Sequence, residues 1–271
     1  MNLVTMLAMN AAILLTLFFV LWLVFQKTRD VTPIDSVWAL GMVALAISSF
    51  FLGSASDDRK YLLLGLCAVW GIRLGGYMLW RWRDHGPDRR YEAMVGKAKA
   101  NKGWGFGHAT ARLVIAPQAP MLFIVCLPVQ LGQAGPPVAL GMLAMVGAAL
   151  AVIGIIFETV SDWQLTKFKK NPDNAGKVMQ YGLWRYTRHP NYFGDACVWW
   201  GLFLIAAETP AGIWSFFGPA LLTWTLIKWS GAPTVENRLH KTREGYADYV
   251  RRTSGFVPMP PKRSSWLSPD S

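Results

Sequence analysis

The sequence predicts an all-α membrane protein, a bundle of about seven transmembrane helices that forms one domain over residues 1–271. Hydrophobic residues make up 53% of the chain and charged residues only 16%, whereas a soluble domain carries about a quarter charged residues. Seven runs approach or reach the ~20 apolar residues that a spanning helix needs. Lys and Arg are concentrated in a few segments beside these runs, which is typical of a polytopic membrane protein.

The predicted spans begin close to the first residue and end before a polar tail. In chain order they cover residues 3–25, 34–53, 61–80, 113–131, 137–157, 193–207 and 211–229. The first run has no basic leader, is longer than a signal core and lacks a clear cleavage site, so we expect a retained helix. The sixth run is short, and its helix must begin slightly earlier to cross a membrane.

The distribution of basic residues predicts the orientation of the bundle. Lys and Arg are concentrated in residues 81–112, in the loop 158–192 and in the tail 232–271. The positive-inside rule places these three segments in the cytoplasm, with the N-terminus outside and the C-terminus inside.

The net charge of +11 could suggest binding to nucleic acid, but the basic residues lie next to membrane spans. There they orient the protein and attract anionic lipid, so we expect membrane lipid as a partner and no nucleic acid. Arg59 and Lys60 fall outside in this orientation, where we expect Asp57 and Asp58 to neutralise them.

Several classes of site are absent from the sequence. Cys67, Cys126 and Cys197 lie within apolar segments without metal-ligand spacing, so we expect neither disulfides nor a metal site. No P-loop is present, and no GxGxxG motif follows a strand, so any cofactor must bind without a Rossmann fold.

The loop 158–192 contains basic, aromatic and acidic residues and lies between two apolar runs. Glu158 and Asp162 are four residues apart and share a helix face, so the preceding helix should extend through them. Pro172 pushes Asn171 out of helical geometry, which should end that helix.

The next helix should begin at Pro190, where the missing N–H of proline costs nothing. Its positive dipole end would face the basic loop, which makes an anion site. Asn191 and Asp195 then lie one turn apart on one face. These residues predict a site for a phosphate-bearing or otherwise charged cofactor at the edge of a membrane.

Three residues of the N-terminal half have two interpretations each. Asp35 either complements the dipole at the start of a span or serves a function within the membrane. Arg73 lies deep in the third span, so we favour a ligand-facing or acid-paired role over snorkelling. We expect the glycines beside it to let a neighbouring helix or cofactor approach closely. Arg89 either follows the positive-inside rule or clamps a phosphate.

The tail predicts a polar helix near residues 235–252. If the tail folds back under the bundle, Glu236, His240 and Tyr249 could contact the site. Alternatively, this helix lies exposed on the lipid surface.

Several motifs resemble the bacterial members of the steroid 5-alpha-reductase family, a large group first described only as a domain of unknown function. They are IDSVWALG, IRLGGYMLWRW, SDWQLTKFKKNP, YGLWRYTRHPNYFGD, WWGLFL and GYADYVRRTSGFVPMPPK, so the resemblance covers nearly the whole chain. The chain is more distantly similar to membrane sterol reductases and to isoprenylcysteine carboxyl methyltransferases, which share RHPxY-like loops.

The resemblance implies a seven-helix membrane oxidoreductase that uses NADPH to transfer hydride to the C=C bond of a lipophilic enone, such as a steroid-like lipid. By motif match it implies these cofactor contacts: Arg73, Arg89, Asp162, Asn191 and Asp195, together with Lys169, Tyr192 and Tyr249. It also implies location in the bacterial inner membrane.

The catalytic residues depart from those of the eukaryotic steroid enzymes, which pair a Glu with a Tyr to polarise the 3-keto group. Trp70 stands where that Tyr would fall, and no clear counterpart of the Glu is present. The nearest acid is Asp35 and the nearest phenol is Tyr77, so these are the predicted catalytic residues.

Two alternatives remain open from the residues. Arg188-His189-Pro190 would also suit a methyltransferase that uses S-adenosylmethionine. A cofactor pocket without a competent acid would instead suit a lipid-binding protein that is not an enzyme.

Overall fold

The computed structural model describes residues 2–53, 58–229 and 231–262, and within them the chain is helical. It divides into two compact units. The first contains Met1–Ala148 and Gly201–Pro219, and the second contains Ala149–Trp200 and Ala220–Ser271. Two long helices continue from one unit into the other, so the expectation of a single membrane domain stays a prediction. Residues 263–271 of the predicted tail, with Arg263, lie outside the described residues.

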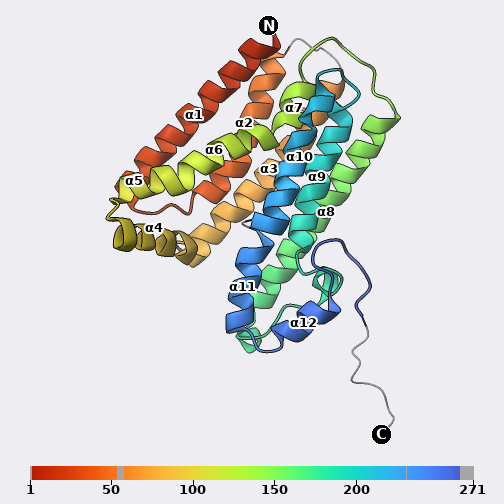
Figure 1. Ribbon diagram of the computed structural model, residues 1–271. Helices are drawn as coiled ribbons and strands as arrows, with labels where there is room; N and C mark the ends of the chain where they lie inside the picture. The colour runs from red at the N-terminus through yellow and green to blue at the C-terminus, as the bar shows by residue number, and fades with distance from the viewer. Residues whose placement is uncertain (1, 54–57, 230, 263–271) are drawn as a thin grey trace. The chain divides into compact units, whose positions relative to one another are not determined.

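The first unit begins with three long helices and continues with shorter ones (Figure 1). Its helices are α1 (Leu3–Thr28), α2 (Ile34–Leu52), α3 (Asp58–His85), α4 (Arg89–Lys102), α5 (Phe106–Thr110), α6 (Ala116–Val125) and α7 (Leu127–Gly132). A π-helical turn, Ala111–Ile115, joins α5 to α6.

The second unit holds most of two long helices and the whole of the polar tail that the structure describes. Its helices are α8 (Met142–Lys170), α9 (Pro190–Ala206), α10 (Phe217–Trp224), α11 (Ala232–Thr242) and α12 (Tyr246–Arg252). The first residues of α8 and α10 and the last residues of α9 belong to the first unit. The sequence predicted one polar helix near residues 235–252, and this prediction is wrong. Gly245, with φ of 74°, separates α11 from α12.

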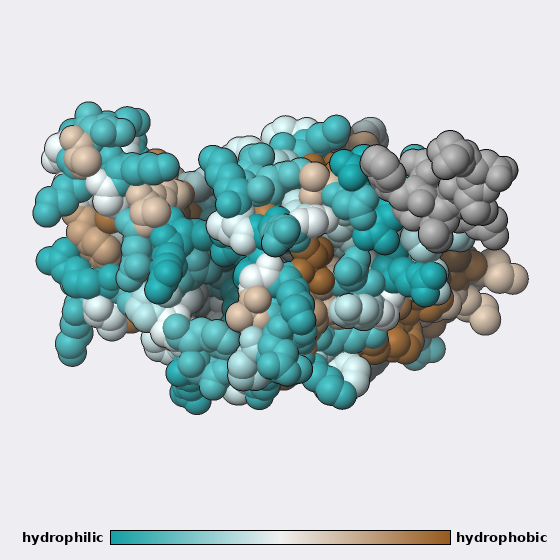
Figure 2. All heavy atoms as spheres, turned by 90° about the horizontal axis from the view of Figure 1, so that it is seen from below, coloured by the Kyte–Doolittle hydropathy of each residue, from teal (hydrophilic) through white to brown (hydrophobic). Residues whose placement is uncertain are grey.

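Within the described residues, five helical stretches are long and apolar enough to cross a membrane, so the chain is a membrane protein. They are Leu3–Thr28, Ile34–Leu52, Asp58–His85, Phe106–Gly132 and Met142–Lys170. Helix α9 has 17 residues, and the last predicted span is divided into a 3-10 turn, α10 and a π-helical turn. The prediction of seven spans, and that of the orientation, remain predictions. The face drawn in Figure 2 is mainly hydrophilic.

Helices α2 and α3 pack closely because two glycines of α3 face α2. A Cβ atom at Gly71 would lie 2.4 Å from the Val43 side chain, and one at Gly75 would lie 2.8 Å from that of Leu40. The expectation that glycines beside Arg73 allow a neighbouring helix to approach is therefore confirmed at these two positions.

A buried ion pair holds together the end of the first unit at which α3 begins. The Arg59 side chain is fully buried and donates to the carbonyls of Val138, Ala139 and Ile205. Its Nη2 lies 2.9 Å from Oε2 of Glu208, so the ion-pair partner that the structure shows is distant in the chain. Asp57, one of the two neutralising residues expected from the sequence, lies outside the described residues.

Glu208 also fixes the start of α8. Its carboxylate accepts hydrogen bonds from the backbone N–H of Gly141 at 3.0 Å and of Ala144 at 2.9 Å. Partial burial acts to raise the pKa of Glu208, but these two bonds and the guanidinium of Arg59 outweigh it and lower the pKa.

We expect Glu208→Gln to destabilise the protein strongly, because removing one partner of a buried pair costs about 3–5 kcal/mol and leaves the Arg59 charge uncompensated. The measurement is the unfolding temperature of the purified protein in a neutral detergent. Glu244→Gln is the matched control, since Glu244 is exposed. Equal unfolding temperatures of the two variants would show that the Arg59–Glu208 pair does not hold the fold.

Candidate functional site

In the second unit, α8 and α9 approach each other through glycines. A Cβ atom at Gly154 would lie 2.5 Å from the carbonyl oxygen of Gly194, and one at Gly194 would lie 2.7 Å from the carbonyl oxygen of Gly154. Three carboxylates are buried on these two helices, with exposed fractions of 3% for Glu158, 5% for Asp162 and 8% for Asp195. Acidic side chains are rarely buried to this extent unless they are paired or serve a site.

The boundaries predicted around these acids are confirmed. Helix α8 ends at Lys170, and Asn171 has extended backbone angles before Pro172. Helix α9 begins at Pro190. Local proline geometry therefore determines where the loop between the two helices starts and stops.

The loop between α8 and α9 is attached to α8 by hydrogen bonds. Gln164 accepts from the backbone N–H of Leu183 at 3.0 Å, and the carbonyl of Ser161 accepts from the Trp184 indole at 3.1 Å. Tyr249, a predicted cofactor contact, is 3% exposed and donates its hydroxyl to the carbonyl of Trp184 at 2.5 Å. Burial raises the pKa of Tyr249, and the nearby Tyr246 adds to this.

Arg188, His189 and Glu236 form a clamp, which we call the loop–tail clamp. Glu236 Oε1 lies 2.8 Å from Arg188 Nε and 2.8 Å from His189 Nε2. Arg188 Nη1 donates to the carbonyls of Val250 and Thr253 at 3.3 and 2.8 Å. The tail therefore folds back onto the loop, as one of the two interpretations of the tail expected.

The loop–tail clamp changes the chemistry of Glu236. Burial acts to raise its pKa, but hydrogen bonds from His189 and Arg188 and their positive charges outweigh this and lower the pKa to about 2. The carboxylate therefore serves as an ionised acceptor at neutral pH. All three kinds of guanidinium nitrogen in Arg188 have partners within the protein, so this arginine is a scaffold residue.

A cavity of about 370 Å³ lies beside the loop–tail clamp. Its lining combines apolar and polar residues: Arg188, Ile227, Ala232, Pro233, Glu236, Asn237, His240, Gly255 and Phe256. Its size is within the range of small-molecule sites, and apolar walls with a few polar groups are typical of such sites.

The remaining predicted contacts of the second unit lie at the ends of α8 and α9. Lys169 is exposed on the last turn of α8. Asn191 and Tyr192 are half-buried on the first turn of α9, and Tyr192 stacks on His189 with ring centroids 5.2 Å apart.

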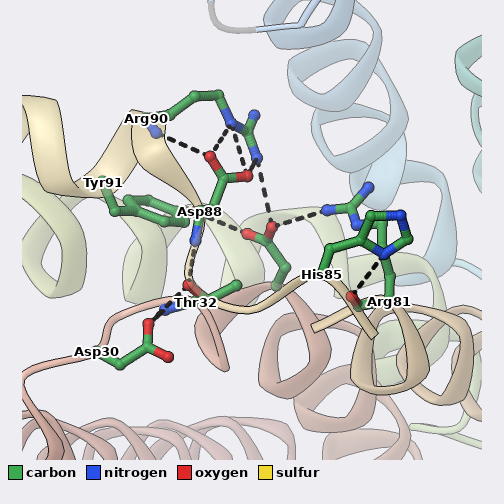
Figure 3. Close-up of polar contacts among 8 residues, drawn as sticks. Asp30, Thr32, Arg81, His85, Asp88, Arg90 and Tyr91 are labelled. Carbon is green, nitrogen blue, oxygen red and sulfur yellow. Dashed lines mark hydrogen bonds and ion pairs between the residues drawn. The ribbon is translucent and has the colours of Figure 1, made fainter. Parts of the chain in front are cut away.

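In the first unit, Asp35 lies at the start of α2 and is an acceptor for three side chains. The hydroxyl of Tyr91 donates to its Oδ1 at 2.7 Å. Arg81 Nη2 and Arg90 Nη2 each lie 3.5 Å from its Oδ2. Figure 3 shows Arg81, Arg90 and Tyr91 directed toward one place between α3 and α4. The sequence predicted Asp35 but none of these partners.

Asp88 connects this cluster to the loop before α2. It accepts from the backbone N–H of Arg90 at 2.8 Å, as the N-cap of α4, and pairs with the Arg90 guanidinium at 2.7 Å. Its own N–H donates to the Thr32 hydroxyl at 2.8 Å (Figure 3). The indole N–H of Trp82 donates to Asp30 at 2.7 Å. The N-cap could have been found from the sequence, since Asp before a helix is a common start signal.

Arg89 and Arg90 are adjacent but differ in their surroundings. Arg90 is held by Asp88 and Asp35, whereas Arg89 is exposed and makes no ion pair with any described residue. The predicted phosphate clamp therefore has a free guanidinium at Arg89, and Arg90 holds the helix that carries it.

The other predicted residues of the first unit lie on α3. Arg73 and Tyr77 are both half-buried and one turn apart, and Tyr77 stacks on Trp80 with ring centroids 5.9 Å apart. The predicted site residues are thus divided: four belong to the first unit and six to the second. Among the described residues, no three or more His, Cys, Asp or Glu side chains form a group that could hold a metal ion.

Comparison with known proteins gives one family and one relative. The sequence model of the family described as "Protein of unknown function (DUF1295)" matches residues 21–253. The chain is 21% identical over 234 residues to the uncharacterized protein C594.04c of Schizosaccharomyces pombe, a match that covers 78% of this chain and 65% of that protein. The chain thus spans about two thirds of the length of this relative. No solved structure matches this chain.

The pKa of Glu236 predicts how stability depends on pH. A carboxyl that titrates at about 2 in the folded chain, against an ordinary 4.5, stabilises the fold above pH 4.5 and loses this contribution as the pH falls from 4.5 toward 2. We expect Glu236→Gln to lower the unfolding temperature at pH 7, with a difference from the unchanged protein that shrinks at pH 3.5. A difference that is the same at both pH values would contradict the ion pair.

The two neighbouring arginines predict a contrast between variants. Arg90→Gln should lower the unfolding temperature slightly, because exposed pairs contribute roughly 0.2–1 kcal/mol. Arg89→Gln should leave it unchanged and should reduce the stabilisation by added NADPH. Thermal unfolding with and without the nucleotide measures both effects, and loss of stability in Arg89→Gln without nucleotide would assign it a structural role.

Proposed function

The chain belongs to the DUF1295 family, and we propose that it is a membrane reductase related to the steroid 5-alpha-reductases, which uses NADPH to reduce the C=C bond of a lipophilic enone. The resemblance of its motifs to that family supports the reaction. The predicted location is the bacterial inner membrane, where a lipophilic substrate can enter from the lipid.

One observation carries the cofactor proposal: Glu158, Asp162 and Asp195 are buried on the closely packed helices α8 and α9. Carboxylate oxygens accept several hydrogen bonds each, so these side chains have the chemistry to accept from a ligand with several hydrogen-bond donors. The ribose hydroxyls and the carboxamide of NADPH are such donors. The chemistry of these side chains therefore fits the cofactor.

Within the second unit, each residue then has a role in binding. Asp162 and Asp195 accept from hydroxyl groups, and Asn191 pairs with the carboxamide. Lys169, which is exposed, is the phosphate contact of this unit. Arg188 holds the loop–tail clamp instead. When bound, NADPH supplies the hydride.

Within the first unit, Arg89 and Arg73 stay the predicted phosphate contacts, and Asp35 and Tyr77 the predicted catalytic residues. The geometry separates the last two. Asp35 accepts a hydrogen bond from Tyr91 and lies beside two guanidinium groups, which makes it an acceptor. We therefore favour Tyr77 as the proton donor to the α-carbon of the substrate.

A second candidate is a methyltransferase that uses S-adenosylmethionine. The cavity of about 370 Å³ beside Arg188 and Glu236 favours it, since a cavity of this size suits a compact cofactor. The third alternative, a lipid-binding protein without catalysis, would retain the fold and bind neither cofactor.

We expect NADPH, and not NADH or S-adenosylmethionine, to raise the unfolding temperature of the purified protein. A ligand at ~100 times its dissociation constant adds about 2.7 kcal/mol to stability. Asp195→Asn should remove most of this gain, whereas Asp173→Asn, a change of the same kind at an exposed loop position, should retain it.

The three outcomes of this titration separate the proposals. Stabilisation by S-adenosylmethionine alone would replace the reductase by the methyltransferase. No stabilisation by any of the three compounds would favour the lipid-binding protein. A gain with NADPH that survives Asp195→Asn would remove α9 from the cofactor site.

A further inference from the structure

A group of cations surrounds one tryptophan between α4 and α5. Lys102 Nζ lies 4.6 Å from the ring centroid of Trp104, and the guanidinium carbon of Arg112 lies 5.6 Å from it. The ring of His108 lies edge-on to Trp104, with centroids 4.6 Å apart. We call these four residues the Trp104 cluster.

The local sequence builds the Trp104 cluster. Helix α4 ends at Lys102 and is capped by Gly103, whose φ of 65° is left-handed. The backbone N–H of Gly103 donates to the carbonyls of Ala98 and Lys99. Trp104 follows this cap directly, and α5 begins two residues later at Phe106. His108 and Arg112 are four residues apart and share a helix face.

The cations of the Trp104 cluster have no acidic partner among the described residues. This distinguishes them from Arg59, Arg90 and Arg188, each of which pairs with a carboxylate within its own unit. Lys102, His108 and Arg112 are all exposed. Two unpaired positive charges and an imidazole at one indole are complementary to a negatively charged group.

The position of the Trp104 cluster identifies that group. Trp104 lies two residues before Phe106–Gly132, a stretch long and apolar enough to cross a membrane. Trp is enriched at membrane surfaces, where Lys and Arg lie close to lipid headgroups. Figure 1 shows α4 lying across the ends of its long neighbours in the first unit, next to α5. The group that meets the cluster at that level is a lipid phosphate.

We propose that Lys102, Trp104, His108 and Arg112 bind the phosphate of an anionic phospholipid. Lys102 and Arg112 pair with the phosphate oxygens, and Trp104 holds both cations near the headgroup. This site is separate from the proposed cofactor residues, and it adds a lipid ligand that the reductase proposal does not require.

The test compares two double variants that remove equal charge from the same region. Lys102→Gln with Arg112→Gln alters the Trp104 cluster, and Lys97→Gln with Lys99→Gln alters exposed lysines of α4 outside it. The probe is a fluorescent short-chain phosphatidylglycerol, titrated into protein in a neutral detergent. Each basic residue near anionic lipid contributes to the free energy of lipid binding. Lys102→Gln with Arg112→Gln should therefore bind the probe about tenfold more weakly than the unchanged protein, and Lys97→Gln with Lys99→Gln should bind it nearly normally.

Three outcomes would overturn the site. Equal weakening in both variants would show diffuse attraction only. Displacement of the probe by an equal concentration of inorganic phosphate would show that the lipid is not required. Loss of the NADPH-induced stabilisation in the first variant would assign the cluster to the cofactor. Failure of NADPH to stabilise the unchanged protein would reject the reductase and leave the lipid result intact.

Discussion

In both units of this protein, an arginine prevents two costs of apolar surroundings: a charge without a counter-ion and a backbone carbonyl without a hydrogen-bond donor. In a membrane, a carbonyl in a loop or in the last turn of a helix needs a donor from elsewhere in the protein. Arg59 supplies donors to three such carbonyls in the first unit, and Glu208 compensates its charge. Arg188 does the same for Val250 and Thr253 in the second unit, with Glu236 as its counter-ion. Each arginine thereby binds the last turn of a helix, α9 for Arg59 and α12 for Arg188.

This role explains why an RHP motif is compatible with more than one reaction. Arg188 and His189 both bind Glu236, and Pro190 starts α9, so all three residues of the motif have a structural task. A reductase and a methyltransferase could each retain such a motif, because it holds the loop and the tail in place. The RHP motif therefore does not by itself distinguish the two reactions, and the predicted cofactor contacts that follow it on α9 are Asn191 and Asp195.

The cations that are not used internally define where ligands can act. Arg90 is committed to Asp35 and Asp88, and exposed Arg89 is not. Lys102 and Arg112 lie over an indole without an acidic partner among the described residues. The first of these groups suits a cofactor phosphate and the second a lipid phosphate. In our proposals, positive charge beside the membrane thus has two separate tasks, one at the cofactor and one at a lipid headgroup.

Features set by neighbours in the chain were predictable from the sequence. Helical runs follow from apolar length, the end of α8 from Pro172, the start of α9 from Pro190, and the close approach to α2 from Gly71. The structure shows Asp162 and Asp195 buried, and their role as cofactor contacts stays a prediction.

Only the tertiary structure decided which charges meet. Glu208 is 149 residues from Arg59, and Tyr91 is 56 residues from Asp35. The tail, for which the sequence predicted one polar helix near residues 235–252, is divided at Gly245. Helix boundaries obey local backbone geometry and can be read along the chain. Ion pairs depend on which side chains the packing brings together, and a charge in the sequence does not name its partner.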